Sequence, residues 1–179
     1  MKTPTKAQLA RAGRRDRIVD AAREIAEEHG WPAVTVRRLA DTIGFSQPVL
    51  YGHFPDGRDG IIRAVALAGF VRLAELLTAG GDLGGLCAAY LEFAGAQPAT
   101  YEAMFSMPTD LEFARPTTPE PLRAAFGPFM STVGDETRAE VLWSALHGLA
   151  DLSRHGRLRP DYATARVGLL IGALRPPPG

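Results

Sequence analysis

The sequence predicts an all-α fold. Apolar residues recur at spacings of three and four along most of the chain, and the strict alternation that is typical of strands is missing. Glycine or proline follows most of these periodic segments, as expected at helix ends. Hydrophobic residues make up 46% of the chain and charged residues 22%, the composition of a globular protein with a buried core. We therefore predict a three-helix bundle containing a helix-turn-helix, followed by a larger helical domain.

Three helices are predicted in the first third of the chain: residues 14–29, 36–43 and 47–54. The first helix has one apolar stripe and ends at Gly30, where a left-handed cap is usual. Thr35 and Ser46 precede the second and third helices and are good N-cap residues. Residues 55–57 (Pro-Asp-Gly) predict a turn after the third helix.

Further helices are predicted at residues 59–77, 86–96, 99–107, 122–133, 135–155 and 161–174. Between the first two of these, residues 78–85 contain four glycines, which predicts a flexible connection. Residues 108–121 contain four prolines, which predicts an irregular loop. The remainder of the chain is thus a second, larger helical region.

Charge is unevenly distributed, although the formal net charge is zero. Residues 1–17 contain six basic side chains and one acidic side chain, so we expect residues 1–13 to form a basic arm that favours a polyanionic partner. A solvated, disordered tail explains the same charges equally well. The single thiol, Cys87, excludes an internal disulfide and a cysteine-rich zinc motif. Apolar runs are too short to span a membrane and no secretory signal is evident, so a cytoplasmic protein is expected.

Residues 36–55 have the spacing of a helix-turn-helix. Counting Val36 as position one, Ala40 falls at position five and Gly44 at position nine. Two helices that cross through a short turn need a small side chain where their backbones approach, and a residue that tolerates positive φ where the chain reverses. The predicted core of this unit consists of Leu39, Ile43, Phe45, Val49, Leu50 and Phe54.

The third helix would then present an outward face without acidic residues. This face consists of Gln47, Pro48, Tyr51, Gly52 and His53. A helix that enters the electronegative groove of double-stranded DNA needs such a face. A plain helical hairpin that touches no DNA is the alternative.

These residues carry a resemblance to a known family. The segments TVRRLAD (35–41), IGFS (43–46) and VLYGHFP (49–55), preceded by a helix that ends in His29-Gly30, resemble the TetR family of transcriptional regulators over residues 14–65. The resemblance implies that the protein binds double-stranded DNA. The family usually has a lysine where this chain has Gly57, so the phosphate contact expected there passes to Arg58.

The resemblance assigns DNA-contacting roles by position, to Thr35, Arg37, Ser46, Gln47, Pro48, Val49, Tyr51, His53 and Arg58. Gln47 would read adenine, because its amide can pair bidentately with N6 and N7. Pro48 and Val49 would contact a thymine methyl group, whereas Tyr51 and His53 would donate to phosphates. For His53, a structural role between helices is the alternative.

The resemblance also implies a homodimer formed through the last two helices. Glycines inside a helix each cost about 1 kcal/mol relative to alanine, so close approach to another helix would explain them. The predicted dimer residues are Leu146, Gly148, Val167, Gly168, Ile171 and Gly172. Packing of both helices inside one subunit is the alternative.

An aromatic and methionine-rich set is expected to line a small-molecule effector pocket, or to be ordinary core. The set comprises Tyr90, Phe93, Met104, Phe105, Met107, Phe126, Phe129, Met130, Trp143 and His147. Within it, Trp143 and His147, with the following Gly148, resemble a TetR subgroup whose C-terminal domain is named for Trp, His and Gly.

The sequence therefore predicts a DNA-binding domain at residues 14–58 and an effector-binding and dimerisation domain at residues 59–179. We expect a regulator, and specifically a repressor, that binds a palindromic operator as a homodimer and is released by a small hydrophobic effector. One alternative is a constitutive DNA-binding protein without a ligand, and another is an effector-binding or enzymatic helical protein with a vestigial head. No GxSxG, HExxH or CxxC spacing is present and the four histidines form no cluster, so no catalytic residue, metal site or cofactor is expected.

Overall fold

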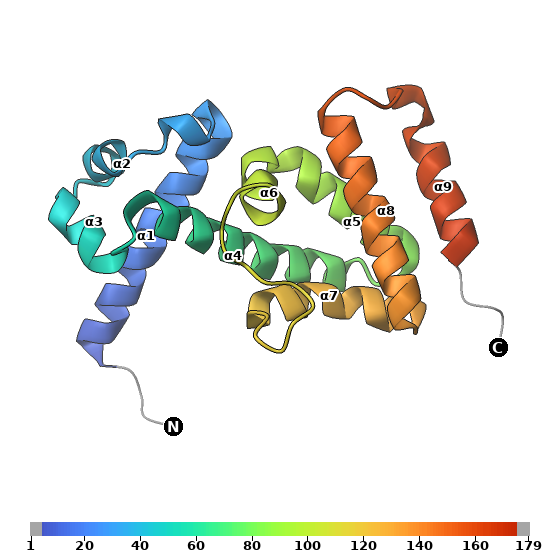
Figure 1. Cartoon of the computed structure of the whole chain (residues 1–179), viewed down its shortest axis with the longest axis horizontal. Helices are drawn as coiled ribbons and strands as arrows, with labels where there is room; N and C mark the ends of the chain where they lie inside the picture. Colours follow the sequence, from blue (N-terminus) through green and yellow to red (C-terminus); the bar gives the residue numbers. More distant parts are fainter. Residues whose placement is uncertain (1–4, 175–179) are drawn as a thin grey trace. The chain divides into compact units, whose positions relative to one another are not determined.

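The computed structural model describes residues 5–174, which hold nine α-helices, two 3₁₀ turns and no β-strand (Figure 1). The helices are α1 (Lys6–His29), α2 (Val36–Ile43), α3 (Gln47–His53), α4 (Gly57–Ala79), α5 (Leu83–Ala96), α6 (Pro98–Phe105), α7 (Glu120–Val133), α8 (Glu136–Arg154) and α9 (Ala163–Leu174), with 3₁₀ turns at Trp31–Ala33 and Pro160–Tyr162. The all-α prediction is confirmed. Over the described range, no helix combines the length and the apolar character needed to cross a membrane.

Helix α1 begins earlier than predicted, at Lys6 instead of residue 14. A capping box starts it: the Thr5 hydroxyl accepts from the Gln8 amide at 3.3 Å, and the Gln8 side chain accepts from the Thr5 amide at 2.8 Å. Residues 6–13 of the predicted basic arm are therefore the first turns of a helix. Residues 1–4 of that arm lie outside the described residues, as do residues 175–179.

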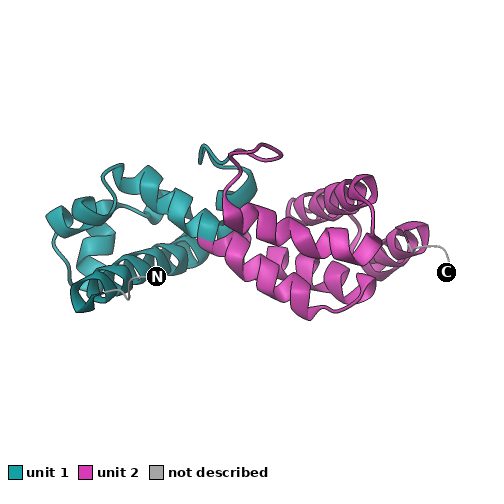
Figure 2. Ribbon diagram, turned by 90° about the horizontal axis from the view of Figure 1, so that it is seen from below, with its two compact units in different colours: residues 1–67, 99–111 teal, residues 68–98, 112–179 magenta. Residues whose placement is uncertain are grey.

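The chain forms two compact units, coloured in Figure 2: Met1–Leu67 with Ala99–Leu111, and Ala68–Pro98 with Glu112–Gly179. In the first unit, α1 packs against the 3₁₀ turn Trp31–Ala33 and against α2. Helix α6 joins this unit because the Trp31 indole N–H donates to the Ala99 carbonyl at 2.9 Å. In addition, the Glu27 carboxylate accepts from the amides of Ala99 and Thr100 at 3.0 and 2.9 Å. The units thus differ from the single boundary predicted at residue 58.

The second unit is a layered helical body in which α5, α7 and α8 pack on one another and α9 packs on α5 and α8. Its largest buried side chains are aromatic and aliphatic. Tyr90 and Phe129 meet edge to face with ring centroids 6.0 Å apart, and both are at most 2% exposed. Leu146 of α8 is completely buried. Figure 1 shows α8 and α9 as neighbouring helices joined by a short connection.

The glycine-rich segment between α4 and α5 is shorter and more ordered than the flexible connection predicted for residues 78–85. Only residues 80–82 lie outside the two helices, and the Asp82 side chain caps α5 by accepting from the Gly85 amide at 2.7 Å. The backbones of Gly80 and Gly85 approach so closely that a Cβ on Gly80 would lie 2.7 Å from the Gly85 carbonyl carbon. These two glycines therefore serve close packing of backbone on backbone.

Replacing Gly85 by alanine should lower the free energy of unfolding by about 2 kcal/mol and Tm by roughly 4–8 °C, because the new methyl group overlaps the Gly80 carbonyl. Gly84→Ala is the matched control in the same turn of helix. A Cβ there meets only ordinary contacts, the nearest being an Asp82 carboxylate oxygen at 3.4 Å. Thermal denaturation followed by circular dichroism measures both variants. Equal stability of the two would contradict the packing argument.

Candidate nucleic-acid interface

Helices α2 and α3, with the turn between them, form the helix-turn-helix that the sequence predicts. Gly44 ends α2 in the left-handed region at φ 70°, and the chain reverses there. The Thr35 hydroxyl caps α2 by accepting from the Arg38 amide at 3.1 Å. Ala40 is buried where the helices approach. Ser46 precedes α3 as predicted, but its side chain makes no capping hydrogen bond, so its predicted capping role is wrong.

One face of α3 is exposed and contains no carboxylate. Leu50 and the following Phe54 are buried and hold the helix in place. The exposed residues are Gln47, Pro48, Val49, Tyr51 and Gly52. Val49 is 37% exposed, so its predicted place in the core is wrong, whereas an apolar contact with a base remains open to it. The side chain of Tyr51 is also about half exposed.

Basic residues of α1 lie alongside this face. The Arg11 guanidinium donates to the Gly52 carbonyl of α3 at 3.2 Å, and Arg17 donates to the Ile43 carbonyl at 3.3 Å. Arg15 stacks over the Phe54 ring with its guanidinium carbon 4.8 Å from the centroid. None of these arginines was predicted as a site residue: Arg11 fell within the predicted arm, and Arg15 and Arg17 on the predicted helix of residues 14–29. The Thr5–Gln8 capping box was the signal that would have placed Arg11 on the same helix.

Helix α2 adds polar side chains to the same unit. Arg37 is 84% exposed and lies 4.0 Å from the Asp41 carboxylate, a surface pair of small energetic value. A shallow depression beside it is lined by Thr35, Arg37, Arg38, Asp41 and Thr42. Arg38, which was not among the predicted site residues, is exposed in this depression and is a second cation on α2.

His53 ends α3 next to the arginines of α1. Its pKa is lowered from the ordinary histidine value, first by burial and then by the positive charges of Arg11, Arg14 and Arg15. The imidazole is half-buried and therefore neutral near physiological pH. Both predicted roles, a donor to phosphate and a structural histidine, are compatible with this position.

If phosphates lie near His53 in a DNA complex, their negative charge raises its pKa above that in the free protein. Affinity for DNA should then increase as pH falls, by about tenfold for each unit by which DNA raises the pKa, because binding takes up a proton. Fluorescence anisotropy at a series of pH values measures this effect, and His53→Gln should abolish it. Circular dichroism confirms that the protein stays folded across the series. A pH dependence that persists in His53→Gln would exclude this histidine as its source.

Arg58 does not have the predicted phosphate-binding geometry. Its guanidinium is partly buried and donates to the carbonyls of Val34 at 3.0 Å and Trp31 at 2.9 Å. These bonds tie the start of α4 to the connection between α1 and α2. The predicted phosphate contact is corrected because these two carbonyls, 24 and 27 residues away in the sequence, hold the guanidinium.

Arg58→Met should therefore lower Tm by roughly 4–8 °C, which corresponds to about 2 kcal/mol for two lost charge-assisted hydrogen bonds. The slope of log affinity for DNA against log salt concentration should not change, since this slope reflects the number of phosphate contacts. Arg63→Met is a control on the exposed side of α4. If Arg58→Met reduced the magnitude of this slope and left Tm unchanged, Arg58 would be a phosphate contact after all.

The predicted effector residues are divided between the two units. Met104, Phe105 and Met107 belong to the first unit, and the other members of the set belong to the second. Tyr90, Phe93, Met104 and Phe129 are at most 2% exposed and form core. The remaining rings of the second unit pack against one another: Phe126 lies 6.3 Å from Trp143, which lies 6.5 Å from His147. Burial lowers the pKa of His147.

The predicted dimer residues separate into two groups. Leu146 is completely buried within α8, so its assignment to an interface is wrong. Val167, Gly168 and Ile171 of α9 line a cavity beside α5 and α8, and Val167 and Ile171 are half-buried there. Gly168 and Gly172 are exposed, and Gly148 is half-buried. The spacing of the glycines did not show which side of α9 packs inside the subunit and which side is exposed.

Comparison with known proteins agrees with this architecture. The profile described as "Bacterial regulatory proteins, tetR family" matches residues 18–65, and the profile described as "Tetracyclin repressor-like, C-terminal domain" matches residues 83–171. The chain belongs to the TetR family. The family is one of bacterial regulatory proteins, and residues 18–65 of this TetR family member, which include α2 and α3, are the part that matches the regulatory-protein profile.

Individual relatives show how far the similarity extends. The HTH-type transcriptional repressor AcnR of Corynebacterium diphtheriae is 37% identical over 68 residues, which is 38% of this chain and 35% of AcnR. The TetR family member thus matches about a third of that relative's length. The protein SCO4313 has 25% sequence identity to this chain, and its crystal structure matches with a TM-score of 0.72 over 95% of this chain and all of that one. A tetR family regulatory protein from Rhodococcus RHA1 has the same fold, with 21% identity and a TM-score of 0.60 over 98% of this chain and all of the other.

Proposed function

We propose that this TetR family member is a repressor that binds a palindromic DNA operator as a homodimer. One observation carries the proposal: the exposed face of α3 has no carboxylate and lies beside Arg11, Arg14 and Arg15 of α1. A groove of double-stranded DNA combines phosphates with base edges, and this surface offers a partner for each.

In the proposed complex, α3 enters the major groove. Gln47 begins the helix, and its exposed amide is suited to bidentate pairing with adenine. Val49 supplies an apolar contact for a thymine methyl group, and Tyr51 donates to a phosphate. Arg11 and Arg14 add charge that holds the helix in register without reading sequence. Thr35, which caps α2, and Arg37 within α2 approach the flanking DNA backbone.

The dimer requires a face on the second unit, and α8 and α9 offer one. Val141 and Leu152 of α8 are 50% and 39% exposed, and Leu169 of α9 is 76% exposed, so these two helices together leave several large apolar side chains in solvent. Exposed Gly172 and half-buried Gly148 on these helices permit close helix contact. We propose that Val141, Gly148, Leu152, Leu169 and Gly172, hereafter the α8–α9 face, replace the inward-facing Leu146, Val167 and Ile171 in the dimer interface.

Selection of bound duplexes from a random DNA pool tests the proposal. We expect enriched sequences with two symmetric half-sites whose centres are about 10 base pairs apart, because each protomer presents one α3 to successive major grooves. The same chain with Tyr51→Glu, which places a carboxylate on the groove-facing surface, is the control and should enrich nothing. A wild-type pool without enrichment would favour a helical protein that does not act on DNA.

Control by an effector is the second part of the proposed function. A cavity in the second unit, beside α9, gives a small molecule a place to bind. Release of the selected operator by a compound that also raises Tm would support an effector-controlled repressor. Operator binding that no stabilising compound affects would favour the constitutive DNA-binding alternative.

A further inference from the structure

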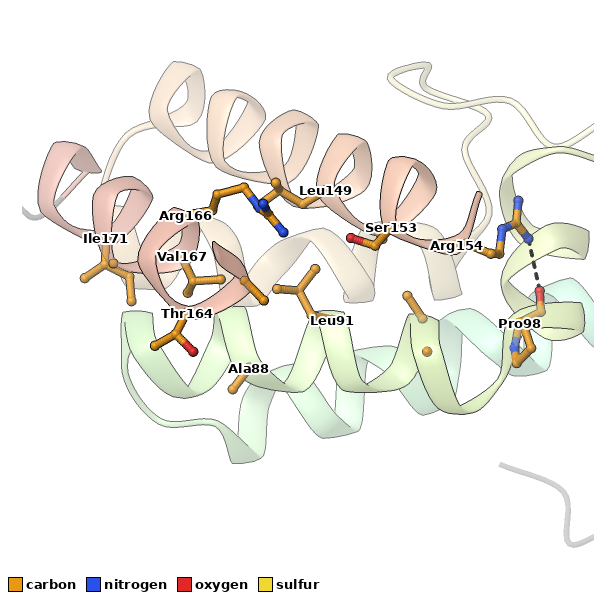
Figure 3. Close-up of a pocket in the computed structure, with 15 residues that line it drawn as sticks. Ala88, Leu91, Pro98, Leu149, Ser153, Arg154, Thr164, Arg166, Val167 and Ile171 are labelled. Atoms are coloured by element: carbon orange, nitrogen blue, oxygen red, sulfur yellow. Dashed lines mark hydrogen bonds between the residues drawn. The ribbon is translucent and has the colours of Figure 1, made fainter. Parts of the chain in front are cut away.

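Helices α5, α8 and α9 border a cavity of about 830 Å³ within the second unit (Figure 3). This volume lies in the range of about 300–1,000 Å³ that is usual for small-molecule sites. The aromatic and methionine-rich set predicted from the sequence does not line it. The cavity is thus a different site from the predicted effector pocket, and it lies beside α9 instead of in the aromatic core.

Most of the cavity wall is apolar. Leu91 projects from α5, Leu149 from α8, and Val167 and Ile171 from α9, as Figure 3 shows. Ala88, also on α5, is exposed at the side of the cavity. A ligand with an aliphatic portion would bury that portion here, with a gain in affinity of about fourfold for each methylene group removed from water.

The polar groups of the cavity are cationic or hydroxylic. Its lining contains Arg154, Arg166, Ser153 and Thr164 but no aspartate or glutamate. Arg154 lies at one end of the cavity and already has partners. Its guanidinium donates to the Pro98 carbonyl at 3.3 Å and pairs with the Asp151 carboxylate at 3.4 Å.

Arg166 has a different environment. Its side chain extends from α9 toward α8 (Figure 3), and it lines the cavity together with Leu149. One of its nitrogens donates to the Arg159 carbonyl at 3.0 Å, which fixes the guanidinium but does not neutralise it. A planar guanidinium held at the edge of an apolar wall is suited to bidentate binding of a carboxylate.

We propose that this cavity binds an aliphatic carboxylic acid. The hydrocarbon chain lies against Leu91, Leu149 and Val167, and the carboxylate pairs with Arg166 and accepts a hydrogen bond from Ser153. An alcohol or amine with the same chain lacks the partner for Arg166 and binds more weakly.

The position of the cavity also couples binding of the ligand to binding of DNA. Helix α9 forms one wall with Val167 and Ile171 and carries Leu169 on its exposed side. An acid that fills the cavity therefore acts on the helix that carries part of the α8–α9 face and changes the spacing of the two α3 helices in a dimer. This regulatory step rests on the proposed function, whereas binding of the acid does not.

Calorimetric titration of the full chain without DNA tests the site, with decanoate, decanol, decylamine and hexanoate as probes. We expect decanoate to bind at least tenfold more tightly than decanol or decylamine, and hexanoate to bind more weakly than decanoate by about fourfold per methylene group. Arg166→Met should weaken decanoate binding at least tenfold and leave decanol binding unchanged. Arg72→Met, on an exposed part of α4 in the same unit, is the matched control and should have no effect.

A second variant keeps the test independent of Arg166. Ala88→Phe places a ring at the exposed side of the cavity and should weaken all four probes without lowering Tm. Equal affinity for decanoate and decanol, or decanoate binding that survives both Arg166→Met and Ala88→Phe, would overturn the assignment, as would no binding at all. Decanoate is then added to the complex with the selected operator. Binding to the protein without release of DNA would contradict only the regulatory step.

Discussion

Gln47→Ala should weaken binding to the selected operator by about five- to 150-fold for each half-site, the equivalent of about 1–3 kcal/mol for a lost bidentate base contact. Affinity for random duplex DNA should change little, because Gln47 reads a base and the phosphates supply most nonspecific binding. The side chain is exposed at the start of α3, so thermal stability should not change. Fluorescence anisotropy with operator and random duplexes measures both affinities.

Arg14→Ala is the matched comparison on α1. Its exposed guanidinium lies near enough to His53 to lower the pKa of that imidazole, and we place it against a phosphate in the complex. The substitution should weaken binding to operator and random DNA alike and reduce the magnitude of the salt slope by about one. Equal losses for both duplexes in Gln47→Ala would show that Gln47 is not a base reader. Unfolding of Gln47→Ala would show that its side chain is not on a free surface.

The helices could be predicted because their signals are local. Periodicity, N-caps such as Thr35 and left-handed glycines such as Gly44 lie within a few residues of the ends that they define. The start of α1 was also locally encoded, by Thr5 and Gln8, but the surrounding charge favoured an arm. The glycines of residues 78–85 indicate a break in the helix and do not reveal that Gly80 and Gly85 pack backbone against backbone.

Side-chain roles that depend on distant contacts could not be predicted. Glu27 accepts hydrogen bonds from the start of α6, 73 residues away at Thr100, and these bonds divide the predicted effector set between the units. Arg58 is similarly engaged by the carbonyls of Val34 and Trp31. The outward residues of α3 were predictable because the helix-turn-helix fixes its buried face with nearby side chains.

Which side of α9 faces inward also depends on distant contacts and could not be predicted from the sequence. Both contain apolar and small residues, so the sequence pattern identifies an apolar helix without showing which side meets α5 and α8. In the structure, Val167 and Ile171 line the cavity and Leu169 is exposed. The glycines Gly168 and Gly172 led the sequence analysis to an interface that included the inward residues. Exposure in the folded unit is what separates the proposed dimer face from the cavity.

Leu169→Arg should convert the dimer to monomers. Two copies of Leu169 bury their side chains in the proposed interface, and each contributes about 1.5–3 kcal/mol. Replacing them with two like charges removes this gain and adds the cost of burying an unpaired cation, so the dimer dissociation constant should rise at least about 100-fold. Sedimentation velocity at a series of protein concentrations measures the change.

The variant should remain folded, because Leu169 is 76% exposed within one protomer. Operator affinity should fall with the dimer, since one α3 reads only half of a palindrome, whereas weak binding to a single half-site should persist. Val71→Arg is the matched control: Val71 is an exposed apolar residue of the same unit, 45% exposed on α4, and lies outside the α8–α9 face. If Leu169→Arg sediments as wild type and binds the operator as tightly, the two protomers do not meet through the α8–α9 face.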